Sequence, residues 1–258
     1  MRLSLVDDLL ATLKTDALVR DVRVGAFWTA VVVERPERGL HCGLASTPER
    51  DKDKHHGMPV VRQAGRLLEQ SALELAALAR SDSQMERSIG LAAINALLLR
   101  DERAWVELNA EHVIAERGKG KDVVVIGHFP FIGRLRSRVG TLSVLELHPV
   151  GPDDLPADRA PDVIPRADVV AITSTTLVNG TFDGLVSLCN PDAFVLMLGP
   201  TTPLSPVLFD YRPDVISGTL VEDIERVLHG VSQGATFRQI RGKRLVTMHR
   251  LGGRYGSL

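Results

Sequence analysis

The sequence is poor in aromatic residues and has no large excess of one charge. Aromatic side chains make up 4% of the 258 residues, and 31 Lys and Arg are balanced by 32 Asp and Glu. Proteins that bind nucleic acid need clustered cations, and those that bind single strands also need rings for stacking. We therefore expect no nucleic-acid partner.

Cysteines and long apolar runs are also scarce. Cys42 and Cys189 lie far apart with no C-x-x-C spacing, so neither a disulfide framework nor a zinc ribbon is indicated. The first eight residues are too acidic for a signal peptide. No apolar run approaches the roughly 18 residues of a membrane span. We expect a cytoplasmic protein without a membrane partner.

The most informative stretch is Asp122–Gly133, which reads Asp-Val-Val-Val-Ile-Gly-His-Phe-Pro-Phe-Ile-Gly. Its apolar run favours a central strand of a parallel sheet, covered on both faces. Pro130 is suited to the first position of a following helix. A turn between strand and helix would present backbone N–H groups to a ligand.

The segments before this stretch predict an α+β domain over residues 1–116. Apolar spacing favours a helix within 1–19 and two more within 64–78 and 83–97, the last with a capping box from Ser83 to Glu86. Three short strands are expected at 22–24, 27–33 and 41–45, the last two joined as a hairpin.

Residues 117–258 alternate between strand and helix and predict a Rossmann-like ligand-binding domain. Right-handed crossovers between such strands give an α/β fold with a doubly wound parallel sheet. The expected strands are 123–126, 143–147, 168–173, 193–198 and 214–217, with an edge strand at 245–249. The expected helices are 131–139, 181–189, 206–211 and 220–229. Four prolines make the link 151–167 irregular.

The loops that follow the expected strands are rich in small, hydroxylated and amide residues. In open parallel sheets these loops bind ligands, and hydroxyls and amides suit a polar, largely uncharged molecule. The nearest cation is Arg134, one turn into a helix. The candidate ligand-binding residues are Gly127, His128, Phe129, Glu146, Ser174, Thr175, Thr176, Asn179, Gly199, Pro200, Thr201 and Ser205.

Several chemistries stay open at this point, and no catalytic residue can be assigned. His128 is a candidate metal ligand or proton carrier. Glu146 stands where a Rossmann acidic residue grips a ribose, although Gly127-x5-Gly133 differs from the dinucleotide fingerprint. Its other interpretation is a solvent-facing strand end, and Thr175, Thr176 and Asn179 can serve as turn and cap residues. His55-His56 is more typical of a charged surface loop.

Three longer strings resemble the family known as putative heavy-metal chelation. They are Gly-His-Phe-Pro-Phe after the first strand, residues 167–181, and Leu-Gly-Pro-Thr-Thr-Pro-Leu-Ser-Pro at 198–206; residues 25–31, 43–45 and 89–96 match as well. The resemblance implies a Rossmann-like domain preceded by a domain like the enolase N-terminal fold. It also implies a cleft between the domains, with Asn95 contributing, and a homodimer.

We therefore expect binding of a small polar molecule, heterocyclic or metal-chelating, with a divalent heavy metal as the possible cofactor. One alternative is an enzyme that uses S-adenosylmethionine or NAD, with Glu146 on the ribose. Another is a non-catalytic sensor or carrier of a metal complex. The sequence leaves both the ligand and the question of catalysis open.

Overall fold

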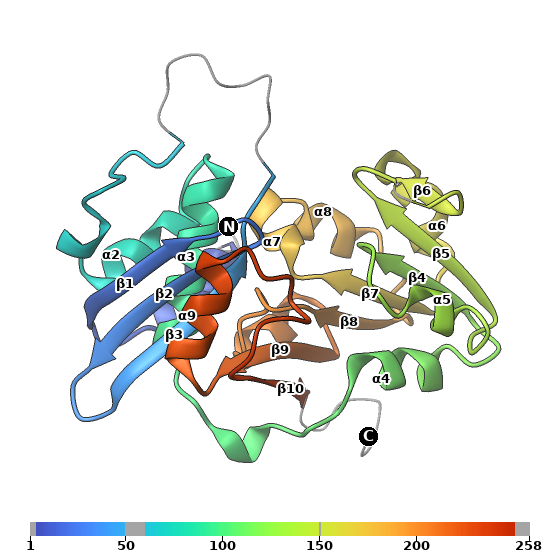
Figure 1. Ribbon diagram of the computed structural model, residues 1–258. Coiled ribbons are helices and arrows are strands. Elements are labelled where there is room, and N and C mark those ends of the chain that lie inside the picture. Colours follow the sequence, from blue (N-terminus) through green and yellow to red (C-terminus); the bar gives the residue numbers. More distant parts are fainter. Residues whose placement is uncertain (1–3, 50–59, 150, 251–258) are drawn as a thin grey trace. The chain divides into compact units, whose positions relative to one another are not determined.

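Three separate parts of the chain build the first of two structural units, and three build the second. The computed structural model describes residues 4–49, 60–149 and 151–250 (Figure 1). Unit 1 comprises Met1–Asp101, Pro200–Val207 and Thr219–Arg244; unit 2 comprises Glu102–Gly199, Leu208–Gly218 and Leu245–Leu258. The sequence suggested one boundary after residue 116, whereas these units are discontinuous in sequence.

Unit 1 is built on an antiparallel sheet of three strands. The strands β1 (Leu18–Val24), β2 (Trp28–Arg35) and β3 (Gly39–Ser46) lie in that order. β2 and β3 form the predicted hairpin, in which Gly39 adopts a φ of 72°. The N-terminal helices of this unit are α1 (Leu5–Thr12), α2 (Ala72–Ala77) and α3 (Gln84–Leu97).

Helices cover both faces of this small sheet. On one face, a Cβ added to Gly43 would lie 2.1 Å from the carbonyl oxygen of Ala92 in α3, so only glycine permits this approach. On the other face, Ala30 and Val32 of β2 pack with Val227 and other residues of α9 (Ile224–Ser232) (Figure 1). Burial on both faces explains why β2 is apolar at consecutive positions.

Helix α9 differs from the expected helix 220–229. Strand β9 continues to Val221, and Asp223 caps the helix by accepting the N–H of Arg226. Thr219 and Glu222 have the spacing of a capping box, which predicts a helix start at Thr219, but this prediction is wrong because Thr219 lies within β9. The amphipathic pattern correctly predicts a helix with one buried face, but the partner of that face is set by tertiary packing.

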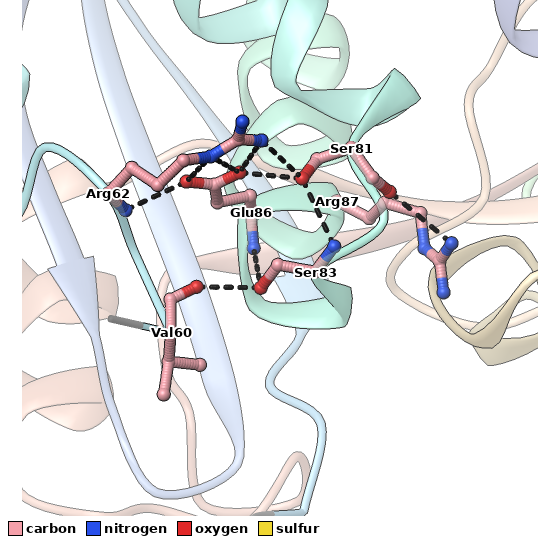
Figure 2. Close-up of polar contacts among 6 residues, drawn as sticks. All are labelled: Val60, Arg62, Ser81, Ser83, Glu86 and Arg87. Atoms are coloured by element: carbon pink, nitrogen blue, oxygen red, sulfur yellow. Dashed lines mark hydrogen bonds and ion pairs between the residues drawn. The ribbon is translucent and has the colours of Figure 1, made fainter. Parts of the chain in front are cut away.

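The capping box predicted at α3 is only half formed. Ser83 accepts the N–H of Glu86, but the Glu86 carboxylate turns to Arg62 and Ser81 instead of back to the cap (Figure 2). The backbone N–H and guanidinium of Arg62 and the hydroxyl of Ser81 all donate to it. Burial would raise the pKa of Glu86, but these hydrogen bonds lower it below its ordinary value.

Most residues of a seven-stranded sheet belong to unit 2, and the strand order of this sheet is β10-β9-β8-β7-β4-β5-β6. Neighbouring strands from β9 to β6 are parallel. The N–H of Glu222 donates to Gly242, and that of Arg250 donates to Asp214, so β10 runs antiparallel to β9. The strands are β4 (Asp122–Ile126), β5 (Thr141–Glu146), β6 (Asp154–Pro156), β7 (Val169–Thr173), β8 (Phe194–Leu198), β9 (Val215–Val221) and β10 (Lys243–His249).

Several helices of the second half are shorter than expected or newly found. Helix α5 covers Ile132–Leu135 instead of 131–139, and Pro206–Tyr211 is a 3-10 helix. Helix α7 (Thr175–Asn179) forms in a segment expected to be a loop, and β6 forms within the proline-rich link. The remaining helices are α4 (Ala110–Arg117), α6 (Ala160–Val163) and α8 (Phe182–Ser187).

The α/β class is confirmed, with a mostly parallel, Rossmann-like sheet and a small antiparallel sheet from the leading segment. Buried side chains of β4, β7 and β8, including Val125, Ala171 and Leu196, form the core of unit 2 together with Ile114 of α4. No helix in the described ranges is long and apolar enough to cross a membrane.

Candidate functional site

The carboxyl ends of four neighbouring strands lie side by side in unit 2. Ile126 pairs with Leu145 and with Ile172, and Thr173 pairs with Leu198, so β5, β4, β7 and β8 end in line. The strand order reverses between β4 and β7, because β5 and β6 follow on one side and β8 and β9 on the other. Open α/β sheets bind ligands at such a switch point. This edge is therefore the candidate site.

Two glycines shape the edge. Gly127 has a φ of 99°, and a Cβ there would lie 2.9 Å from the Cβ of Thr173. Gly199 has a φ of 129°, and its Cβ would lie 2.5 Å from the Oγ of Ser174. Both positions combine a left-handed backbone with a lack of space, so they require glycine.

His128, directly after β4, pairs with a carboxylate. Its Nδ1 lies 3.2 Å from Oδ2 of Asp154, and the side chains are 39% and 3% exposed. The same Oδ2 accepts the N–H of Gly151 at 2.8 Å. When Nδ1 carries a proton and donates it to Asp154, Nε2 keeps a lone pair for a ligand. The imidazole is thus oriented by a buried carboxylate while the ring stays accessible.

Asp154 was missed by the sequence reasoning. It lies in the link 151–167, which four prolines made appear irregular. The sequence signal for Asp154 is the short segment Asp154-Leu155-Pro156. This segment can form an edge strand, because Pro is tolerated there. Parallel pairing with β5 brings this segment to the candidate site.

Glu146 ends β5 beside His128. Its Oε1 accepts the backbone N–H of His128, and its Oε2 accepts that of Leu147 at 3.1 Å. The carboxylate therefore has a structural partner on each oxygen and holds the turn after β4. This arrangement accounts for an acidic residue here without a ribose.

Thr175 and Thr176 make local hydrogen bonds at the start of α7. The N–H of Thr175 donates to Oγ1 of Thr173, and the hydroxyl of Thr176 donates to the carbonyl of Thr173 at 2.7 Å. Ser174 differs, because its Oγ is buried and has no partner among the described residues. Neither the donor nor the acceptor capacity of its hydroxyl is used among these residues.

Asn179 makes the tight turn expected at the end of this loop. Its Oδ1 accepts both the N–H and the hydroxyl of Thr181, at 3.1 and 2.7 Å, and Gly180 follows with a φ of 78°. Thr181 makes no side-chain capping bond to α8. The turn interpretation thus accounts for the observed contacts of Asn179.

An aromatic pair lies after β4. The rings of Phe129 and Phe131 stack with centroids 5.1 Å apart and an angle of 9° between planes. Arg134, the nearest cation in sequence, is held by Glu111 through two hydrogen bonds of 3.1 and 2.7 Å. These hydrogen bonds hold the pKa of Glu111 below its ordinary value. The Arg134–Glu111 contacts link α5 to α4, so both residues have a structural role.

The remaining predicted residues lie in unit 1. The amide of Asn95 donates to the carbonyls of Leu44 and Thr201 at 2.9 and 3.1 Å, and Thr201 Oγ1 accepts the N–H of Ser46. Ser205 accepts the N–H of Val207 at 3.4 Å, and Pro200 begins this segment. The Oδ1 of Asn95 has no partner in the described part of the chain. The predicted cleft between domains stays a prediction.

The described residues do not fit a bare heavy-metal ion. Among them, no group of three or more His, Cys, Asp or Glu is placed to hold a metal. Burial raises the pKa of the Cys42 thiol to about 12 and that of Cys189 to about 11, so the thiolates that soft metals prefer are scarce at neutral pH. The pair His55-His56 lies outside the described residues.

Comparison with known proteins places the chain in a family. The model of the DUF364 family, described as "putative heavy-metal chelation", matches residues 109–249. The DUF4213 model, with the same description, matches residues 6–98. The chain belongs to the DUF364 family. No curated protein matches it.

Two solved structures share the fold of this DUF364 member. A protein of unknown function from the same family in Desulfitobacterium hafniense DCB-2 is 26% identical, with a TM-score of 0.80 over 95% of this chain and 97% of that one. A family member from Pyrococcus horikoshii is 22% identical, with a TM-score of 0.80 over 95% and 98%. Both likenesses extend through the two units.

Proposed function

We propose that this protein binds a small metal chelate, and that His128 donates Nε2 to the metal. The supporting observation is the 3.2 Å pairing of the accessible imidazole with the buried carboxylate of Asp154. Histidines that ligate metals commonly donate their other N–H to a carboxylate, which fixes the ring and raises its basicity. The metal here is part of the ligand and arrives with its own chelator.

The surroundings of His128 support an organic chelator over a bare ion. A single imidazole cannot hold a heavy metal by itself, whereas a chelated metal needs only one further donor. The stacked rings of Phe129 and Phe131, which follow His128 in the chain, offer aromatic surface to an organic chelator. The family description, heavy-metal chelation, agrees with this class of ligand.

The alternatives drawn from the sequence depend on other features. An enzyme that uses S-adenosylmethionine or NAD would place Glu146 on a ribose; one backbone N–H donates to each oxygen of Glu146, which explains this carboxylate without a ribose. A sensor or carrier of a metal complex would use the same His128 contact without turnover. We therefore base the proposal on binding alone.

The test measures binding of the Ni²⁺–nitrilotriacetate complex, which leaves coordination positions open for imidazole. Isothermal titration compares the full chain with His128→Ala and with the control His148→Ala, another exposed histidine near this edge. We expect His128→Ala to remove the tightest binding event and His148→Ala to leave it. Equal affinity in all three proteins would refute the proposal.

The second variant tests the role of the carboxylate. Asp154→Asn keeps the shape of the side chain but weakens the hydrogen bond to Nδ1. Loss of such a partner costs about 10- to 100-fold in metal affinity. The midpoint of thermal unfolding, measured on the same samples, shows whether the variant stays folded. A folded Asp154→Asn protein with unchanged affinity would show that the carboxylate does not orient the ligand.

A further inference from the structure

A second candidate site lies within unit 1. A groove of about 490 Å³ runs along α9 and the segment that follows it. Its polar lining consists of Arg226, His229, Gln233, Gln239 and Arg241. No Asp or Glu is among the described residues that line it. This volume lies within the range of about 300–1,000 Å³ that is typical of small-molecule sites.

The charge of the surrounding segment is strongly one-sided. Residues 226–244 contain five cations, Arg226, Arg238, Arg241, Lys243 and Arg244, and no acidic residue. The formal charge of the whole chain is −1, so the overall balance hides this segment. Asp223 and Glu222, just before it, pair with Arg226 and Arg244. Glu225 also precedes the segment, so the charge available to attract an anion to the groove lies mainly on Arg241.

The backbone brings the two lining arginines together. After α9 the chain turns back, and Gly242, with a φ of 81°, lies against the helix. A Cβ on Gly242 would lie 2.8 Å from the Cβ of Asp223 and 3.3 Å from that of Arg226. Arg241 therefore approaches the groove beside Arg226.

The groove presents hydrogen-bond donors. Gln239 uses its Oε1 to accept the N–H and the hydroxyl of Thr236, at 2.9 and 2.8 Å, so its amide NH₂ remains to donate. The carbonyl end of α9 would disfavour an anion. However, the N–H of Gln233 bonds to carbonyls of the last turn, which reduces this effect.

The rest of the lining is small. Gly230, Gly234 and Ala235 contribute little more than backbone to the wall of the groove. Gly234 has a φ of 71°, a conformation that larger residues rarely adopt. The small side chains leave room for the body of an organic molecule next to the arginines.

We propose that this groove binds a small organic phosphate monoester, with Arg241 and Arg226 on the phosphate. Arginine forms bidentate, charge-assisted hydrogen bonds to phosphate, and the amide of Gln239 adds a donor. The proposal is independent of the chelate at His128, because the lining residues of the groove belong to unit 1 and those of the chelate site to unit 2.

The test uses AMP as the probe and the full chain in low-salt buffer. Isothermal titration compares the natural protein with Arg241→Gln and with the control Arg238→Gln, which removes a charge from the same segment but not from the lining. We expect Arg241→Gln to weaken AMP binding by about tenfold or more, as for loss of a charge-assisted contact, and Arg238→Gln to change it by less than about threefold. Unchanged thermal unfolding midpoints establish that the variants are folded.

Two results would overturn the proposal. The first is a lack of AMP binding by the natural protein; if a single-stranded oligonucleotide binds instead, the groove is a polyanion surface. The second is an equal loss of AMP binding in both variants, which would indicate only a diffuse field. Adenosine serves as the control ligand without phosphate, and inorganic phosphate as the anion without an organic body. Binding of inorganic phosphate as tight as that of AMP would contradict the organic part of the proposal.

Discussion

The buried carboxylate of Glu86 allows a quantitative prediction about stability. Its side chain is 2% exposed and accepts from Ser81 at 2.6 Å and from the backbone N–H of Arg62 at 2.8 Å (Figure 2). Glu86→Gln keeps the shape but removes the charge-assisted hydrogen bonds, and its NH₂ group takes the place of one acceptor oxygen. Such bonds contribute about 1.5–3 kcal/mol each against about 0.5–1.5 for neutral ones, so two of them predict a loss of about 2 kcal/mol.

The pH dependence follows from the lowered pKa of Glu86. In the unfolded chain the carboxyl titrates near its ordinary value of 4.5, and in the folded protein it titrates lower. The carboxylate therefore stabilises the fold fully above that value, and this contribution is lost as the pH falls through the folded pKa. The difference between the natural protein and Glu86→Gln should be largest near pH 7 and should shrink below about pH 4.5.

Urea denaturation at a series of pH values measures this difference. Glu69→Gln is the matched control, because Glu69 forms an exposed pair with Arg66 and such pairs contribute about 0–1 kcal/mol. If Glu86→Gln costs no more than Glu69→Gln at pH 7, the buried network does not stabilise the fold. If its cost is large but independent of pH, the loss comes from packing and not from charge.

Further predictions concern glycines and thiols. Gly43→Ala should destabilise the protein by about 1–3 kcal/mol in denaturant titrations, because its Cβ would meet α3, whereas Gly133→Ala, which meets nothing within 4 Å, should cost less. Equal costs for the two would contradict the close packing of α3. Cys42 and Cys189 should react slowly with iodoacetamide at pH 8 in the native protein and rapidly in urea, because burial raises the pKa of both thiols. Fast native alkylation would show that these thiols are accessible.

The strands of the parallel sheet could be predicted because each is a short apolar run bounded by turn residues. Asp122–Ile126 and Phe194–Leu198 match the expected segments closely. Helix α9 shows the limit of this reasoning. Its periodicity predicts a buried face, but only tertiary packing decides that this face covers the small sheet of unit 1.

At the candidate site, too, the sequence predicts which residues share one edge of the sheet but not which side chains pair. Chain order places Gly127, Glu146, Ser174 and Gly199 at one edge, because parallel strands connected by crossovers end on the same side. The pairing of His128 with Asp154 could not be predicted, since it depends on a three-residue edge strand inside a proline-rich link. The segment that carries Thr201 and Ser205 follows β8 in sequence but packs with unit 1.

The basic segment 226–244 is hidden when charge is summed over the whole chain. The overall balance of 31 cations and 32 anions conceals a stretch of five cations without an anion. A sliding count of charge would have found it. Sequence alone would still not show that the chain turns back along α9 and brings Arg241 beside Arg226.

The proposed contact between a chelated metal and Nε2 of His128 can be located directly in crystals. The crystals are soaked with Ni²⁺–nitrilotriacetate and measured at the nickel absorption edge. We expect an anomalous peak about 2.1 Å from Nε2 of His128, a normal distance between a divalent metal and imidazole nitrogen. A peak elsewhere, with none at His128, would contradict it.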